Sequence, residues 1–173
     1  MLCAAGLLVA TGTPQTAASS SWVQFRHPTF GFSISYPQGW ETLSGEGKAA
    51  FAALGPSAKG VANVRLGIVV TTARIPDGAT LEEADMGLER LLAGRTDTVR
   101  ILRKDRIDLR GVPALLTYVV RHNPQGIDLY QMVLILAHNG RGYAVVGVTA
   151  AGSSNLPDET RLLQTLMLTF QPR

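Results

Sequence analysis

The histidines are considered first, because histidine is the side chain that serves most often as a metal ligand or a general base near neutral pH. This chain of 173 residues has three, His27, His122 and His138. Their positions show no H-x-H, H-E-x-x-H or paired-cysteine spacing, so no familiar metal centre is predicted. His122 and Asp128 flank the turn "HNPQGID" and are expected to meet across a hairpin. This pair is a candidate ligand set for calcium or zinc, although two ligands do not complete a site.

Serine, histidine and aspartate all occur, so the residue types alone permit a hydrolase. The arrangement argues against it, because there is no G-x-S-x-G elbow and "GFSIS" has the pattern of a strand. There is also no P-loop or dinucleotide fingerprint, since the glycines of "GRGYAVVG" fall in a hairpin and a strand. We therefore predict that the protein is not an enzyme and has no cofactor, with a hydrolase kept as a third hypothesis.

The strongest charge feature is the basic run "RILRKDRIDLR". Four of its residues share one parity of a predicted strand and would form a stripe for an acidic partner protein or for acidic lipid headgroups: Arg100, Lys104, Arg106 and Arg110. Asp105 and Asp108 interrupt the stripe, which favours the alternative of an ordinary solvated sheet surface. The net charge of +3 is too mild, and the aromatic residues too few, for a nucleic-acid interface.

The segment "FGFSISYPQGW" opens the folded region with an alternating strand. Pro37 ends the strand because proline lacks the backbone donor, and Gly39 allows the chain to turn. Trp40 then follows, either as an exposed docking residue or as a side chain that closes the core. A tryptophan directly after a strand is more often buried, so we predict the second role.

Helical and strand patterns alternate along the rest of the chain. "TLEEADMGLERLLAG" has a capping box formed by Thr80 and Glu83, and "LPDETRLLQTLMLTF" predicts a second helix near the end. Strands are predicted in "FAALGP", "NVRLGIVVTTARI", "TVRILRKDRIDLRG", "VPALLTYVVRH" and both arms of a hairpin turning at "HNGRG", whereas "ETLSGEGKAA" is predicted to be a loop. The fold class is α+β, with the two helices covering either opposite faces of one mainly antiparallel sheet or a single face. We favour the three-layer α/β/α sandwich.

The N-terminal segment "MLCAAGLLVATG" is apolar but too short to span a bilayer, and small residues follow it. We predict that residues 1–19 are a signal peptide and that residues 20–173 form a single domain without a transmembrane span. Cys3, the only cysteine, would be removed with the signal peptide. A longer natural N-terminus would restore the alternative of a lipoprotein anchor at Cys3.

In order, the motifs "FGFSISYPQGW", "IDLRGVPALLTYVV", "GRGYAVVGVTA" and a final helix ending in "LTFQP" resemble the PsbP-like domain family. The resemblance extends from about Val23 to Gln171 and implies an α/β/α sandwich around an antiparallel sheet. It also implies a docking or stabilising module on a membrane complex, since the family includes lumenal subunits of photosystem II, assembly factors and exported bacterial proteins and lipoproteins. The long N-terminal arm of plant PsbP has no counterpart between Ser19 and Phe25, and there is no convincing lipobox.

Two functional hypotheses follow. The first is an exported, monomeric, non-enzymatic domain that binds a protein partner at a membrane surface, in the periplasm, the extracellular space or the thylakoid lumen. The second is a carrier of a small ligand or metal, with its pocket between the sheet and a helix.

Overall fold

A computed structural model describes residues 21–44, 49–76, 78–93, 98–122 and 126–173, with the backbone alone described over residues 88–93. The strands of the first half are β1 (Trp22–His27), β2 (Phe32–Pro37), β3 (Glu41–Ser44), β4 (Phe51–Ser57) and β5 (Arg65–Arg74). Helix α1 (Leu81–Ala93) follows, and then β6 (Thr98–Leu109), β7 (Val112–His122), β8 (Asp128–His138) and β9 (Arg141–Ala150). The chain continues with helix α2 (Leu156–Leu168) and the short strand β10 (Gln171–Pro172).

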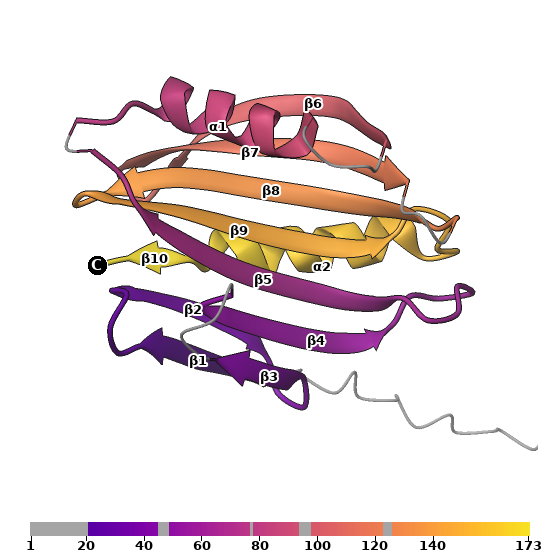
Figure 1. The fold of residues 1–173 in the computed structure, drawn as a ribbon. Coiled ribbons are helices and arrows are strands. Elements are labelled where there is room, and N and C mark those ends of the chain that lie inside the picture. The colour runs from indigo at the N-terminus through magenta and orange to yellow at the C-terminus, as the bar shows by residue number, and fades with distance from the viewer. Residues whose placement is uncertain (1–20, 45–48, 77, 94–97, 123–125) are drawn as a thin grey trace, which may run out of the picture.

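These strands form two sheets, both with antiparallel neighbours (Figure 1). The large sheet has the order β3-β4-β5-β9-β8-β7-β6, and the small one has the order β1-β2-β10. The mainly antiparallel α+β prediction is confirmed, but the expectation of one sheet is wrong. The motif around Phe32 forms β2, which pairs with β1 and with the C-terminal strand β10 and not with the large sheet. Gln171 of β10 lies opposite Ser33 of β2.

Two elements were not predicted. The stretch at 41–44 was expected to be loop, yet it pairs with β4 as β3, with Thr42 opposite Ala53. The strand β10 has only two residues, which is too short to produce an alternating pattern in the sequence. Both elements exist because a longer neighbouring strand offers them backbone partners, and a single sequence does not display that pairing.

Glycine-containing turns connect the long strands of the large sheet. Arg110-Gly111 joins β6 to β7 and Asn139-Gly140 joins β8 to β9, and all four residues have positive φ values between 50° and 86°. Two successive residues with positive φ form the type I′ turn whose twist matches that of a hairpin. The hairpin predicted at "HNGRG" is therefore confirmed.

The two helices contact opposite faces of the large sheet (Figure 1). Residues of α1 lie over Ala144 of β9 and Ile135 of β8, whereas Met167 of α2 lies over Gly147 of β9. Ala144 and Gly147 differ in strand parity, so their side chains point to opposite faces. The face with α2 also carries the small sheet, so the molecule is not built from three simple layers.

The main core lies between the large sheet, α2 and the small sheet. Phe32 of β2 stacks on Phe170, with ring centroids 5.4 Å apart, and Tyr143 of β9 meets both rings edge-on. Trp40 packs partly buried against this core, and a Cβ added at Gly55 would lie 2.4 Å from its ring. The prediction that Trp40 closes the core is thus confirmed, and Gly55 is required for the ring to lie there.

Candidate functional site

The predicted basic stripe on β6 is interrupted by a β-bulge. Ile101 pairs with Val119 and Arg103 pairs with Tyr118, which leaves Leu102 without a partner on β7. An extra residue reverses the side-chain alternation beyond it. Arg100 lies opposite Val120 and Lys104 opposite Thr117, positions of different parity on β7, so these two cations point to opposite faces. The expectation of a common face is wrong.

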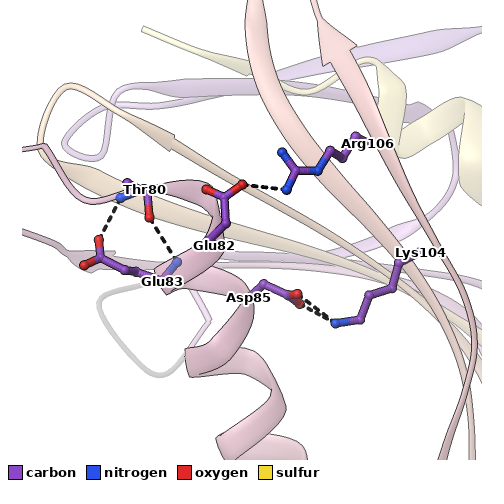
Figure 2. A network of polar contacts seen from close by, with 6 residues as sticks. All are labelled: Thr80, Glu82, Glu83, Asp85, Lys104 and Arg106. Atoms are coloured by element: carbon purple, nitrogen blue, oxygen red, sulfur yellow. Dashed lines mark hydrogen bonds and ion pairs between the residues drawn. The ribbon is translucent and has the colours of Figure 1, made fainter.

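Two members of the stripe, Lys104 and Arg106, are paired with helix α1 (Figure 2). The Lys104 Nζ atom lies 2.8 Å from both carboxylate oxygens of Asp85. The Arg106 Nη2 atom lies 2.6 Å from Oε1 of Glu82. The pKa of Glu82 is lowered, first by a hydrogen bond from its own backbone amide and then by Arg106. These two cations therefore anchor α1 to the edge strand.

The capping box predicted for α1 is present beside these ion pairs. The backbone amide of Glu83 donates to the Thr80 hydroxyl at 3.2 Å, and the Thr80 amide donates to the Glu83 carboxylate at 2.8 Å. The exchange satisfies two amides at the helix start that have no helical carbonyl partner. It fixes the first turn, from which Glu82 and Asp85 reach β6.

Arg100 and Arg110, the remaining members, form no ion pair within the described part of the chain. Arg100 lies near the start of β6, whereas Arg110 occupies the turn after it with a φ of 57°. The predicted stripe is consequently divided into a paired centre and two separate exposed ends. Whether these cations bind a partner stays a prediction.

His122 and Asp128 do meet across the β7–β8 hairpin, as predicted. They are opposite one another in register, and the His122 Nδ1 atom lies 2.7 Å from Oδ1 of Asp128. Each side chain is 56% exposed. Among the described residues no group of three His, Cys, Asp or Glu side chains could hold a metal ion. A metal at this pair stays a prediction.

His27 has a structural role at the turn between β1 and β2. Its Nδ1 atom accepts hydrogen bonds from the amides of Thr29 and Phe30, each at 3.1 Å. Its ring stacks on Phe30 with centroids 4.4 Å apart. Burial, and secondly the charge of Arg141, lower the pKa of His27. The neutral ring therefore closes this turn, and within the described residues no serine hydroxyl is hydrogen-bonded to a histidine.

Glu159 has a buried carboxylate, a property typical of functional sites, and the sequence analysis did not single it out. It is only 6% exposed and accepts hydrogen bonds from the Lys59 amide at 2.9 Å, the Ser153 hydroxyl at 2.7 Å and the Thr149 hydroxyl at 2.6 Å. Burial alone would raise its pKa, but the hydrogen bonds from Thr149, Lys59 and Ser153 together lower the pKa. The carboxylate joins α2 to β9 and to the β4–β5 turn, so its role is structural.

A cavity of about 250 Å³ lies between α1 and the large sheet. Its lining is almost wholly apolar and includes Ala84 and Gly87 of α1, Ile135 of β8 and Ala144 of β9. A pocket between a helix and the sheet was the expectation of the carrier hypothesis. The described lining offers few polar groups that would orient a ligand.

No profile of a known protein family and no curated protein sequence matches this chain. Solved structures do. The chain is similar to cyanobacterial PsbP (CyanoP) from Synechocystis sp. PCC 6803, with a TM-score of 0.67 and 14% identity over 94% of this chain and 99% of that one. The chain has the PsbP-like fold.

Other proteins share this fold. The Ran-binding protein Mog1p of Saccharomyces cerevisiae matches with a TM-score of 0.59 and 14% identity, over 89% of this chain and 96% of its own. LpqN of Mycobacterium tuberculosis, described as involved in cell envelope biogenesis, matches with a TM-score of 0.56 and 13% identity over 87% of each chain. The resemblance seen in the sequence is thereby confirmed at the level of the fold. None of the described helices is long and apolar enough to cross a membrane.

Proposed function

We propose that this protein is an exported, non-enzymatic docking domain that binds a protein partner on a membrane-associated complex. The observation that carries the proposal is the end-to-end match to PsbP, together with the match to a Ran-binding protein. Photosystem II is the complex that the resemblance to PsbP suggests. A monomer in solution fits the proposal, because each partner-binding surface is then accessible.

The polar side chains of the described residues support a binding role over catalysis. The buried carboxylate of Glu159 has its oxygens occupied by three donors. The His27 ring accepts hydrogen bonds from two backbone amides. The His122–Asp128 pair lies at an exposed hairpin end. These arrangements hold turns and strands in place, and a general base needs a free nitrogen or oxygen next to a substrate.

Export belongs to the proposal as well. The signal peptide predicted for residues 1–19, and the alternative lipid anchor at Cys3, lie outside the described residues. Expression of the full chain in a bacterial host, followed by N-terminal sequencing of the protein from the periplasm, tests this part. A mature chain that begins near Ser20 supports export, and an unprocessed chain in the cytoplasm contradicts it.

A quantitative pull-down from detergent-solubilised membranes of the source organism tests the docking role. The wild-type protein is compared with Arg100→Glu and with Arg110→Glu, which change the two ends of β6 without breaking the α1 ion pairs. Recovery of a stoichiometric partner by the wild type, reduced several-fold by one of these variants, supports the proposal. Absence of any stoichiometric partner with the wild-type protein contradicts it.

The fourfold reversal at Arg100, Lys104, Arg106 and Arg110 tests the original stripe. Because Lys104 and Arg106 hold α1, this variant needs a thermal melt as a control. The paired centre of β6 is part of the interface if the fourfold variant folds normally but loses the partner, while each single variant retains the partner.

A carrier of a small apolar ligand is the second candidate, favoured by the cavity beneath α1. Native mass spectrometry and metal analysis of the purified protein separate the two functions. A stoichiometric bound molecule, or stoichiometric zinc or calcium, would support the carrier and would make the docking role secondary.

A further inference from the structure

Three basic or titratable side chains form a row across neighbouring strands at one end of the large sheet. Arg141, the first residue of β9, lies directly opposite Arg74 of β5 on one side and directly opposite His138 of β8 on the other. Residues that are opposite in register project from the same face of a sheet. We call Arg74, Arg141 and His138 the cationic row. Figure 1 shows its strands meeting at the end of the molecule that also carries the β1–β2 turn.

The position of the two arginines is energetically unfavourable by itself. Like charges directly opposite one another on adjacent strands are destabilising. Elsewhere in the described chain, carboxylates offset two of the arginines on β6: Asp105 pairs with Arg103 at 2.9 Å and Glu82 pairs with Arg106 at 2.6 Å. Arg74 and Arg141 have no such partner among the described residues.

The side-chain carboxylates of the described residues are engaged elsewhere. They pair with Arg65, Arg103, Lys104, Arg106, His122 or Arg161, or they accept hydrogen bonds from backbone amides and hydroxyl groups. Within the described part of the protein, no side-chain carboxylate therefore forms an ion pair with the cationic row.

Two contacts within the protein hold the Arg141 side chain in place. Its Nη1 atom donates to the Thr72 hydroxyl at 3.0 Å, and its guanidinium lies over the Phe30 ring at 5.0 Å from the centroid. Phe30 is in turn stacked on His27. A guanidinium fixed on an aromatic face loses little side-chain entropy on binding and keeps donors free for a carboxylate. Arg141 is partly buried and Arg74 is exposed, so a ligand can reach both.

We infer that the cationic row binds an acidic segment of the protein partner, with carboxylates engaging Arg74 and Arg141. The inference rests on the proposed docking function and gives that function a surface. Neighbouring strands are about 4.8 Å apart, so the row is about 10 Å long. An extended segment with two or three acidic side chains has the matching length. Fork-shaped guanidinium groups suit carboxylates because two parallel hydrogen bonds can form.

The experiment measures fluorescence anisotropy of a fluorescein-labelled hexaglutamate peptide with the full chain at low salt. We expect binding by the wild-type protein and about tenfold weaker binding by Arg74→Gln/Arg141→Gln, because two charge-assisted contacts are lost. The matched control is Arg103→Gln/Arg161→Gln, which removes two exposed arginines, one of them also lying over an aromatic ring. The control should change the affinity by less than about twofold.

Several results would overturn the inference. Equal weakening by both double variants would indicate a diffuse charge effect, and no binding by the wild type would show that the row does not take acidic peptide. Hexaglutamine peptide binding as tightly as hexaglutamate would exclude charge recognition. Vesicles of anionic phosphatidylglycerol that bind the row, with hexaglutamate not binding, would assign the row to lipid. Displacement of the peptide by micromolar inorganic phosphate would assign it to a free anion.

Backbone amide chemical shifts give a readout that does not depend on affinity. Titration with hexaglutamate should move the signals of Arg74, His138 and Arg141 and leave those of the distant β7–β8 hairpin unchanged. Shifts confined to any other surface would contradict the inference. In the membrane pull-down, a partner retained equally by wild type and Arg74→Gln/Arg141→Gln refutes the row alone, whereas no partner for the wild type refutes the docking function.

Discussion

Helices α1 and α2 cover opposite faces of one sheet, and they are attached to it by different interactions. On the α1 side, the described contacts with the edge strand are the ion pairs Lys104–Asp85 and Arg106–Glu82, with a cavity beneath the helix. On the α2 side, Leu163, Leu166 and Met167 are fully buried, and the carboxylate of Glu159 is hydrogen-bonded on the inside of the fold.

The difference makes α2 a firmly attached structural helix, whereas the attachment of α1 can change with the solution conditions. Ion pairs that solvent can reach are typically worth about 0–1 kcal/mol and weaken as salt rises. Buried hydrogen bonds to a charged group are worth about 1.5–3 kcal/mol, and breaking one leaves buried donors unsatisfied. We therefore expect α2 to separate only on global unfolding and α1 to respond to ionic strength.

Removal of the Glu159 side chain should have the largest effect. Glu159→Ala leaves the Lys59 amide and the Thr149 and Ser153 hydroxyls without their acceptor, and we expect a loss of about 3 kcal/mol in the free energy of unfolding. Urea denaturation followed by circular dichroism measures the loss. A decrease below about 1 kcal/mol would contradict a structural role for this carboxylate.

The charge of Glu159 can be tested separately through pH. Because its pKa is lower in the folded than in the unfolded chain, the ionised form contributes stability above its ordinary pKa, and this contribution is lost as pH falls through the lowered value. Glu159→Gln keeps an acceptor but cannot titrate. The stability difference between wild type and this variant should therefore shrink between about pH 7 and about pH 3. A difference that grows with acidification would contradict the assignment.

A methyl group added at Gly147 should have the next largest effect. The new Cβ would lie 2.9 Å from the Met167 sulfur and 3.4 Å from the Leu163 Cβ, at the centre of the α2 contact. Overpacking of this kind costs about 1–3 kcal/mol, and the flexible methionine places Gly147→Ala at about 1–2 kcal/mol. Thermal unfolding measures it, and an unchanged melting temperature would show that α2 is loosely packed.

Loss of an α1 ion pair should cost less and should depend on salt. For Asp85→Asn we expect a destabilisation of about 1 kcal/mol at low ionic strength, because both side chains of the pair are about a quarter exposed. In about 0.5 M NaCl the difference from wild type should narrow. The matched control is Glu159→Ala, whose deficit should be nearly insensitive to salt.

The smallest expected effect has the opposite sign. Gly87 of α1 has open space where a Cβ would be placed, with no atom within 4 Å. Gly87→Ala should therefore stabilise the protein by about 0.5–1 kcal/mol, because alanine favours the helix and meets no obstacle. A glycine-to-alanine substitution is thus expected to lower the stability at Gly147, beside α2, and to raise it at Gly87, in α1. A destabilising Gly87→Ala in a thermal melt would mean that α1 packs more tightly than its cavity indicates.

Features set by a few adjacent residues were predictable from the sequence. The capping box at Thr80 and Glu83, the Asn139-Gly140 hairpin and the contact of His122 with Asp128 each depend on local chain geometry. The core position of Trp40 was predictable too, since a large aromatic group after a strand has a strong tendency to be buried.

Features that depend on pairing between distant segments were not predictable. The bulge at Leu102 reverses the faces of Arg100 and Lys104, and no residue near it signals an extra position in the strand. Glu159 looks like an ordinary first-turn acid of a helix, and only the fold brings Lys59 and Thr149 to it. The opposition of Arg74 and Arg141 likewise appears only once β5 and β9 are neighbours.

The bulge at Leu102 has a consequence for association of the protein with itself. β6 is an outer strand of the large sheet, 12 residues long, and carries the exposed side chains of Ile101 and Leu102. A regular strand of that length and character would be a template on which a second molecule could extend the sheet, the first step toward a fibril. The misaligned backbone at the bulge denies an incoming strand a continuous ladder, so we expect it to oppose extension of the sheet at the point where Ile101 and Leu102 are exposed.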